Sequence, residues 1–357
     1  MTDLFIIFVL AFTGSVLFTL LLLSPARMMG YVDAPEKHDA GRKKHAKAVP
    51  PIGGVVVIPL AIVLSWMAGF DWLSHWPVLT AIMLMLITGA IDDKYHINSV
   101  LKLALQILAA YLIVVPGGAV LTYLGNLLGF GPIDFGIFAG PFSIFCIVLL
   151  INAINMIDGL DGLSGGVAII ILSSISLLMI LGGGSSELVP LCITVIGTLI
   201  GFWLLNMRFP WQNSARVFMG DGGTLALGAF IAWLAITVYN NGGAAIPSMS
   251  LGWLLAFPVM DAFAIFTLRL SQKRSPFSPD RLHFHHILRD SGFRTSAAVG
   301  IIYLINIAYS GIAFMTLSFH KMPEAVFFYP WLFILALHTL IIFKSGQAEN
   351  ALSNKIL

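Results

Sequence analysis

The sequence predicts an all-α, polytopic integral membrane protein with about eleven transmembrane helices. Of its 357 residues, 58% are hydrophobic and only 10% are charged, and the mean hydropathy is +0.93. Soluble domains carry about 25% charged residues, so this composition excludes an ordinary soluble protein. No long polar block separates the apolar segments, and we therefore expect a single membrane-embedded domain over residues 1–357.

The expected spans follow from the length of the apolar runs, because a helix needs about 20 apolar residues to cross the hydrocarbon core. Eleven segments approach this length: 4–23, 51–69, 76–91, 99–115, 136–153, 166–181, 189–206, 224–240, 247–269, 297–318 and 327–344. The first is too long and too weakly flanked for a cleaved signal peptide. Cys146 and Cys192 both fall inside apolar segments, so we expect small core residues there rather than a disulfide or a metal site.

The basic residues predict the orientation in the membrane, because Lys and Arg are enriched on the cytoplasmic side. With eleven spans, 18 of the 19 basic residues fall on one side and only Lys321 on the other. The N-terminus is then outside and the C-terminus is cytoplasmic. Residues 117–135 are apolar enough for a twelfth span, but a span there would reverse this distribution for the rest of the chain. We expect a short external or interfacial segment instead.

The richest polar stretch of the chain runs from Asn152 to Gly166 between two apolar segments. In a helix, Asn152, Asn155 and Asp158 would lie on neighbouring faces. The glycines that follow would let the backbone turn sharply and return Asp161 towards the helix end. Polar groups at membrane depth are costly and are usually functional, although a plain helix cap and turn is the alternative interpretation.

Other polar groups fall at the same predicted cytoplasmic ends. Asp92 and Asp93 close one span, Phe218-Met-Gly-Asp221-Gly-Gly opens another, and His283, His285 and His286 lie in the loop after the ninth span; Asp261 lies within that span. Several carboxylates at one face need a cation, and carboxylate and amide oxygens suit Mg²⁺, which also binds phosphate. The residues therefore predict a site for a diphosphate on Mg²⁺ with a lipid as the second substrate.

Each group also has a structural interpretation. Asp92-Asp93 could be an exposed cap, and Asp261 could be a structural hydrogen-bonding residue. The three histidines could bind a transition metal, but no cysteine is near them and their flanks are basic. Phe218 could simply pack, and the basic run at residues 43–47 could be only a topology signal.

Four motifs together resemble the polyprenyl-phosphate N-acetylhexosamine-1-phosphate transferases of glycosyltransferase family 4. They are Asp92-Asp93, the N-x-x-N-x-x-D-G-x-D-G-L run of residues 152–163, F-x-G-D-G-G from Phe218, and H-x-H-H from His283. Pro51-Ile-Gly-Gly is similar to a further P-x-x-G-G element of the family. The resemblance extends over essentially the whole chain. It implies transfer of a sugar-1-phosphate from a UDP-sugar to a polyprenyl phosphate, with Mg²⁺ and release of UMP; Mn²⁺ could replace Mg²⁺.

The resemblance also implies a role for individual residues. Asn155 and Asp221 match the metal ligands of the family, and Lys102 matches a lysine that contacts the diphosphate. Asp161 and Phe218 match positions that hold the uracil, with the ring stacked on Phe218. The resemblance further implies that Asp92, Asp93 and Asp158 are catalytic residues. It implies that the segment with His283, His285 and His286 binds phosphate.

The last motif favours one branch of the family. Residues 282–288 read L-H-F-H-H-I-L rather than the H-H-H-x-E of the peptidoglycan-precursor branch, and so resemble the N-acetylglucosamine-1-phosphate branch that starts O-antigen and related cell-surface polysaccharides. The expected partners are a UDP-N-acetylhexosamine, undecaprenyl phosphate and the lipid bilayer of a bacterial inner membrane, with no nucleic acid. The peptidoglycan-precursor transferase remains an alternative, a cation-coupled transporter is a second one, and homodimer formation is open.

Two mechanisms are compatible with these residues. The lipid phosphate is already anionic at neutral pH, since a second phosphate pKa lies near 6, and it hardly needs a strong base. We therefore expect direct in-line attack, with Asp92 assisting proton removal or positioning. A two-step route through an aspartyl phosphate is the alternative.

Overall fold

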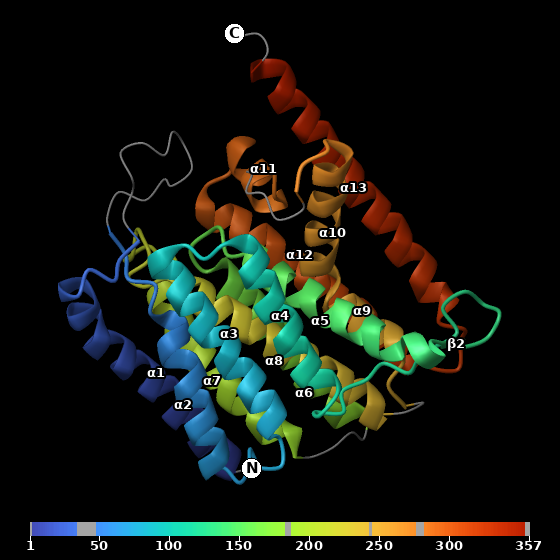
Figure 1. Ribbon diagram of the computed structural model, residues 1–357, viewed down its shortest axis with the longest axis horizontal. Helices are drawn as coiled ribbons and strands as arrows, with labels where there is room; N and C mark the ends of the chain where they lie inside the picture. Colours follow the sequence, from blue (N-terminus) through green and yellow to red (C-terminus); the bar gives the residue numbers. More distant parts are fainter. Residues whose placement is uncertain (1, 34–47, 183–186, 243–244, 276–281, 354–357) are drawn as a thin grey trace.

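The computed structural model describes residues 2–33, 48–182, 187–242, 245–275 and 282–353 (Figure 1). Its N-terminal half contains six helices and one short hairpin: α1 (Thr2–Met28), α2 (Gly53–Met67), α3 (Trp76–Tyr95), α4 (Ser99–Val114), β1 (Tyr123–Leu124), β2 (Ile133–Asp134), α5 (Ala139–Met156) and α6 (Leu163–Leu181), with a 3-10 turn at Gly136–Phe138 before α5. Its C-terminal half is helical: α7 (Leu188–Asn206), α8 (Gly220–Gly242), α9 (Ser248–Leu254), α10 (Ala256–Ser271), α11 (Phe284–Asp290), α12 (Thr295–Ser318) and α13 (Ala325–Ser353). Among the described residues, the expected all-α class is therefore confirmed apart from one two-residue strand pair.

All of the eleven expected segments coincide with helices, but fewer of them satisfy the length and composition of a membrane span. In the described part of the chain, eight helices do so, or nine when the bent pair α9 and α10 counts as one span. The helices α2 and α4 are apolar but have only 15 and 16 residues. The structure thus supports eight or nine spans, and both the number eleven and the orientation of the termini stay predictions.

The segment expected as one straight span at 247–269 is instead two helices, α9 and α10, that meet at an angle of 71°. The break falls at Leu255, and Pro258 then occupies the first turn of α10, where a proline is tolerated because its missing N–H has no partner there. Residues 117–135 contain no helix; they form the β1–β2 hairpin, in which Tyr123 pairs with Asp134. The prediction that this segment does not span the membrane is confirmed.

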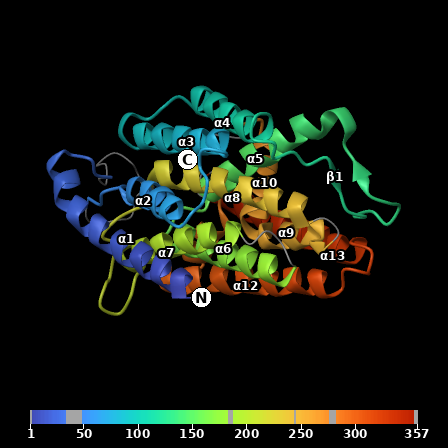
Figure 2. The same cartoon turned by 90° about the horizontal axis from the view of Figure 1, so that it is seen from below.

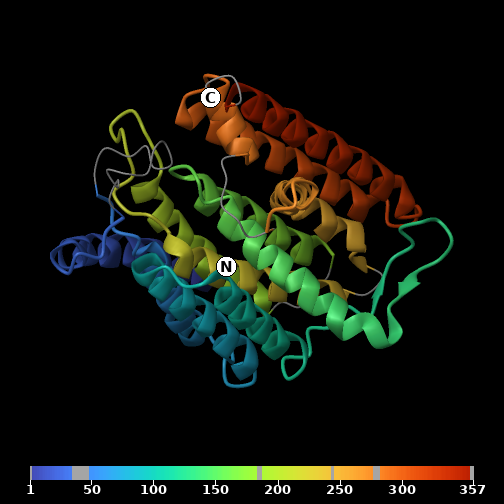
Figure 3. The ribbon, with the colours of Figure 1, turned by 45° about the horizontal axis from the view of Figure 1, so that its top comes forward.

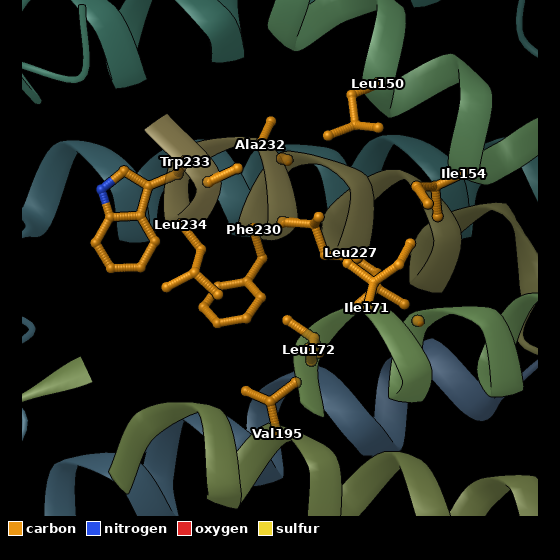
Figure 4. Packing of buried hydrophobic residues seen from close by; sticks show 14 of the residues in the cluster. Leu150, Ile154, Ile171, Leu172, Val195, Leu227, Phe230, Ala232, Trp233 and Leu234 are labelled. Atoms are coloured by element: carbon orange, nitrogen blue, oxygen red, sulfur yellow. The ribbon is translucent and has the colours of Figure 1, made fainter. Parts of the chain in front are cut away.

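The helix α8 is the centre of the molecule, and 94% of its 18-residue apolar stretch is buried. It packs against α2, α3, α5 and α6. Figure 4 shows Leu227, Phe230 and Trp233 of α8 among apolar side chains of the neighbouring helices α5, α6 and α7. Lipid tails are as apolar as these side chains, so the association of such helices depends on close packing rather than on escape from water.

Small residues make that packing possible where α8 begins. A Cβ atom added to Gly54 of α2 would overlap the backbone of Gly223, and one added to Gly89 of α3 would overlap Asp221 and Gly222. The backbones of α2, α3 and α8 therefore lie in direct contact at this point. The carboxylates that α3 and α8 carry here are consequently fixed by backbone packing.

The remaining helices form two flanks around this centre. The helices α1, α2 and α7 pack together on one flank, and α10 packs against α5 and α13 on the other. Figures 2 and 3 show α3 and α4 together along one edge, with α12 and α13 on the opposite side of the molecule. Only 11% of the corresponding 18-residue apolar stretch of α13 is buried, as expected for a helix that faces lipid.

Candidate active site

A polar cavity of about 810 Å³ lies where several of these helices end. Its wall is formed by residues after α1, the end of α3, the α5–α6 turn, the loop before α8, and α11 with the start of α12. Seven of the residues predicted for the site line it: Asp92, Asp93, Asp158, Asp161, Phe218, Asp221 and His286. The other four, Asn155, Lys102, His283 and His285, do not line the cavity, but each of them contacts a residue that does.

Lys102 joins two of the cavity carboxylates. Its Nζ atom lies 2.8 Å from Asp92 Oδ2 and 2.5 Å from Asp221 Oδ2. The other oxygen of Asp92 accepts a hydrogen bond from the backbone N–H of Ile97, at 2.6 Å. Both oxygens of Asp92 are thus engaged, and this residue holds the Lys102 ammonium between α3 and α8.

Asp93 points in a different direction, as expected for adjacent residues about 100° apart on a helix. Its Oδ1 atom accepts from the N–H of Asp221 at 2.9 Å, and Oδ2 lies 3.5 Å from the N–H of Gly222. These amides are unpaired donors of the first turn of α8, and a carboxylate is favourable at a helix N-terminus. Asp93 therefore caps α8 and fixes the position of Asp221.

Asn155 reaches Asp221 from α5. Its Nδ2 atom donates to Asp221 Oδ1 at 2.9 Å and to Thr224 Oγ1 at 2.8 Å. Among the described residues, no group of three His, Cys, Asp or Glu side chains is placed to hold a metal alone. Mg²⁺ binds through one or two carboxylates and takes phosphate oxygens and water for the rest. Asp221 and the carboxamide of Asn155 fit such a site once the amide turns its oxygen towards the cavity.

Asp158 lies in the α5–α6 turn, where Ser164 Oγ donates to its Oδ1 at 2.5 Å. Burial raises the pKa of the Asp158 carboxyl to about 7, the hydrogen bond from Ser164 opposes that rise, and the charges of Asp221 and Asp161 add to it. A carboxyl group with such a pKa changes its charge near neutral pH, which is the property required of a general acid or base.

Asp161 lies at the other end of the same turn and forms an ion pair that the sequence did not predict. Its Oδ2 atom lies 2.6 Å from Arg208 Nε and also accepts from the N–H of Ala215 at 3.2 Å. Asn206 then connects the two segments, because its Oδ1 accepts from Gly162 N and its Nδ2 donates to Val217 O. Gly162 has a φ of +87°, a conformation that favours glycine.

Phe218 is positioned by backbone hydrogen bonds to the P-x-x-G-G element. Its N–H donates to Pro50 O at 3.0 Å, and its carbonyl accepts from Gly53 N at 2.9 Å. Gly54 N donates in turn to Met219 O. The element from Pro51 to Gly54 thus holds the segment that leads into Asp221, and a Cβ atom at Gly53 would overlap the Phe202 ring and Phe218 O.

The histidine segment is anchored by Asp261, which is almost fully buried in α10. Asp261 Oδ2 lies 2.8 Å from His283 Nδ1, and Oδ1 accepts from Phe284 N at 3.0 Å. His338 Nε2 of α13 lies 3.2 Å from the same Oδ1 atom. His283 is therefore bonded behind the cavity wall, whereas His286 lines the cavity.

His285 occupies the space between these two neighbours. Its ring stacks on His283 at 5.5 Å and lies 4.2 Å from the ring of His286. Its Nε2 atom faces Gly159 of the α5–α6 turn, where a Cβ atom would overlap the ring. Burial and the charges of His286 and His283 hold the pKa of His285 well below its usual value, so this histidine is neutral at pH 7.

Sequence reasoning missed three residues of this arrangement. Arg208 was interpreted only as a topology signal, Asn206 as part of a span, and His338 as part of the last span. A usable signal existed for His338, because an ionisable residue inside an apolar run suggests a specific partner. The basic residues at 37–47 and Arg281 lie outside the described residues.

Comparisons with known proteins agree with the motifs. Residues 75–239 match the sequence profile described as Glycosyl transferase family 4. The chain is 30% identical over 336 residues to "Undecaprenyl-phosphate alpha-N-acetylglucosaminyl 1-phosphate transferase" of Escherichia coli (strain K12), covering 94% of this chain and 88% of that protein. The proteins of the same name from Haemophilus influenzae and Salmonella typhi are 30% and 29% identical, over 83% and 91% of this chain and 82% and 86% of their own lengths.

The extent and identity of these matches decide the family. The Escherichia coli relative is 30% identical over 94% of this chain, which extends well beyond the profile match at residues 75–239. The alternative of a cation-coupled transporter is therefore wrong, because the family consists of transferases. The chain belongs to glycosyl transferase family 4, as a multi-pass membrane member of the polyprenyl-phosphate N-acetylhexosamine-1-phosphate transferases.

Proposed function

We propose that this protein transfers N-acetylglucosamine-1-phosphate, or a related N-acetylhexosamine-1-phosphate, from a UDP-sugar to undecaprenyl phosphate and releases UMP. One observation carries the proposal: five predicted site aspartates from three segments meet around one cavity at the ends of membrane helices, with Lys102 bonded between two of them. The relatives at 30% identity are named as N-acetylglucosaminyl 1-phosphate transferases, which supports N-acetylglucosamine as the sugar. Basic residues at the same ends support a cytoplasmic site in a bacterial inner membrane.

The reaction is a phosphoryl transfer between two anionic substrates. An oxygen of the lipid phosphate attacks the sugar-linked phosphorus of the UDP-sugar, the bond from that phosphorus to the UMP oxygen breaks, and UMP leaves with the electron pair. Catalysis of such a step consists mainly of positioning and charge stabilisation. Lys102 is placed for this task, because Asp92 and Asp221 hold its ammonium group between α3 and α8.

Asp221 and Asn155 would hold Mg²⁺, which when bound supplies positive charge to the diphosphate. The remaining residues position the metal ligands or line the cavity, and their contacts in the structure show which of them does which. Asp93 fixes the N-terminal turn of α8, and Asn155 is itself held by Thr224. His286 and Arg289 add cationic or hydrogen-bonding capacity to the opposite wall of the cavity.

The contacts of Asp92 and Asp93 favour direct attack over a covalent aspartyl phosphate. Both oxygens of Asp92 accept hydrogen bonds, from Ile97 N and Lys102 Nζ, and those of Asp93 face the amides of α8. A nucleophilic carboxylate needs an oxygen free to approach phosphorus. We therefore expect delipidated enzyme to exchange no labelled UMP into UDP-sugar, and robust exchange in that assay would support the two-step route.

The decisive experiment uses the purified protein with undecaprenyl phosphate and a panel of UDP-sugars. The panel contains UDP-N-acetylglucosamine, UDP-N-acetylgalactosamine and the muramoyl-pentapeptide donor of peptidoglycan synthesis, and UMP release is measured with and without Mg²⁺. We expect Mg²⁺-dependent release that requires both substrates and is fastest with UDP-N-acetylglucosamine. Preference for the muramoyl-pentapeptide donor would assign the protein to the other branch, and no release with any donor would contradict the proposal.

A further inference from the structure

Tyr31 lines the cavity beside the carboxylates of α3 and α8, although it belongs to neither helix and to none of the motifs. It follows the end of α1, and its hydroxyl donates to Ala90 O of α3 at 3.1 Å. The Asp93 carboxylate interacts with the same hydroxyl through its charge and a hydrogen bond, and the charge of Asp221 also acts on it. The Tyr31 hydroxyl therefore lies at the edge of the carboxylate cluster on the α8 wall.

The segment that carries Tyr31 is fixed by its backbone. Tyr31 N donates to Ala26 O at 2.9 Å, and Gly30 between them has a φ of +67°, the left-handed conformation that commonly ends a helix. Two residues further on, Asp33 and Val49 exchange backbone hydrogen bonds of 2.9 and 3.1 Å. The Tyr31 ring packs against the hydrophobic core. A side chain held in this way is preorganised, so little conformational entropy is lost when its hydroxyl binds a ligand.

The hydrogen bond from Tyr31 to Ala90 is one that the phenol can exchange. Ala90 lies inside α3, where each carbonyl oxygen already accepts from the N–H four residues further along the helix. Ala90 O therefore keeps a partner when the phenol turns towards the cavity, and no buried polar group is left unpaired. The hydroxyl is thus available to a ligand that offers a stronger acceptor.

The phenol remains protonated at neutral pH. Burial raises the pKa of Tyr31 above its usual value, and the charge of Asp93, the hydrogen bond to Asp93 and the charge of Asp221 raise it further. The usual pKa of a tyrosine is already about 10. Tyr31 therefore offers the cavity a hydrogen-bond donor that adds no negative charge.

The charges near Tyr31 indicate which ligand needs this donor. Asp92, Asp93 and Asp221 line the same wall, and a substrate phosphate that reaches it is repelled by their negative charges. Lys102 is a donor here, but its ammonium group is already bonded to Asp92 and Asp221. A neutral hydroxyl that donates to a phosphate oxygen adds attraction at this wall, and hydrogen bonds to charged acceptors are stronger than those to neutral ones.

We propose that the Tyr31 hydroxyl donates a hydrogen bond to a phosphate oxygen of a bound substrate and thereby helps to hold that phosphate against the carboxylate-rich α8 wall. The phosphate belongs either to the UDP-sugar or to the polyprenyl phosphate, which present the same chemistry to the hydroxyl. Tyr31 is then a substrate-binding residue contributed by the segment after α1. This inference rests on the proposed function and adds to it a contact outside the motifs.

The test removes only the hydroxyl, with Tyr31→Phe in the purified full-length protein in detergent. UMP release is measured with UDP-N-acetylglucosamine or undecaprenyl phosphate varied while the other substrate is saturating. Calorimetry then gives the dissociation constant of UDP-N-acetylglucosamine without lipid, and a melting curve reports stability. Tyr95→Phe is the matched control, because Tyr95 lies at the end of α3, is 69% exposed and does not line the cavity.

We expect Tyr31→Phe to lower kcat/KM for one substrate by about 10- to 100-fold, the range of a hydrogen bond to a charged group. The melting temperature should stay at the wild-type value, and Tyr95→Phe should match the wild type in every measurement. Weaker calorimetric binding of UDP-N-acetylglucosamine by the same factor would place the hydroxyl on the diphosphate. Unchanged calorimetric binding with a higher KM for undecaprenyl phosphate would place it on the lipid phosphate.

Three results would overturn the inference. Kinetics of Tyr31→Phe equal to those of Tyr95→Phe would remove the hydroxyl from the substrate site. A lower melting temperature with unchanged kinetics would leave it only the structural contact between α1 and α3. A lower kcat with both KM values and the calorimetric constant unchanged would assign it to the positioning of Asp93. Each of these results is compatible with UMP release by the wild type, whereas a wild type that releases no UMP would contradict the proposed function as well.

Discussion

In both walls of the cavity an aspartate accepts hydrogen bonds from another segment, but the residues that it positions differ. On the α8 wall, Asp93 accepts from the amides of Asp221 and Gly222, and the residue it fixes, Asp221, faces the cavity. On the histidine wall, Asp261 accepts from Phe284 N and binds His283, and both groups lie behind the residue that faces the cavity, His286. In each wall, one aspartate positions a segment whose neighbouring residue faces the cavity; Asp261 is buried behind its wall, whereas Asp93 also lines the cavity.

The comparison separates residues that touch the reacting groups from those that position them. The α8 wall is rigid at the level of the backbone, because Gly54, Gly89 and Gly223 bring three helices into contact. The histidine wall depends on side chains, since α11 has only seven residues and is anchored through Asp261 and His338. Substitutions should therefore affect the two walls in different ways.

The largest effect is expected for Asp221→Asn on the α8 wall. This change removes the charge that holds Lys102 and the proposed Mg²⁺ ligand, so we expect turnover to fall by at least about 100- to 1,000-fold while the protein stays folded. UMP release at saturating Mg²⁺ and a melting curve in detergent measure both properties. Asp134→Asn on the β1–β2 hairpin is the control, and near-normal turnover of Asp221→Asn would refute its assignment.

Asp93 should behave as a cap, unlike its neighbour. Asp93→Ala leaves the first amides of α8 unpaired, and we expect a loss of about 0.5–2 kcal/mol of stability together with reduced turnover. Asp93→Asn should recover part of the stability, because Asn also caps helices. Asp92→Asn should reduce turnover with little change in stability. If thermal unfolding ranked Asp92→Asn below Asp93→Ala, the capping role would be assigned to the wrong residue.

The helices of this fold could be predicted from the sequence because apolar runs are local signals. The cluster of Asp92, Asp158 and Asp221 could also be anticipated, since all three fall at helix ends on the side of the basic residues. Contacts between residues that lie far apart in the chain could not be predicted in this way. Arg208 lies 47 residues from Asp161 and His338 lies 77 from Asp261, and a single sequence contains no signal that joins such pairs.

The histidine wall should show a smaller effect that differs between its buried and exposed members. His286→Ala removes a cavity-lining side chain, so we expect a higher KM for the UDP-sugar at an unchanged melting temperature. Asp261→Ala leaves His283 and Phe284 N without their acceptor, and should lower the melting temperature as well as the affinity, because an unsatisfied buried group costs about 1–3 kcal/mol. His338→Phe should lie between them. Equal melting temperatures for all three variants would show that the anchor is unimportant.

The smallest effect concerns pH and Asp158, which lies in the turn between the two walls. Burial raises the pKa of its carboxyl to about 7, so the group is protonated below that pH and ionised above it. If the ionised form is required, kcat/KM should fall as the pH drops through about 7. The residual kcat/KM of Asp158→Asn should not fall at about pH 7, and should fall only near pH 6, where the lipid phosphate is protonated. A wild-type profile that is flat between pH 6.5 and 8 would contradict this assignment.

The same raised pKa has a consequence for stability that needs no substrate. Between the unfolded value of about 3.8 and the folded value of about 7, the folded protein holds a proton that the unfolded chain has released. The contribution of Asp158 to stability therefore decreases as the pH rises through this range and is constant above it. Relative to Asp158→Asn, the wild-type melting temperature should fall from pH 5 to pH 7 and then stop falling. A difference in melting temperature between the wild type and Asp158→Asn that is independent of pH would show that the Asp158 carboxyl titrates normally.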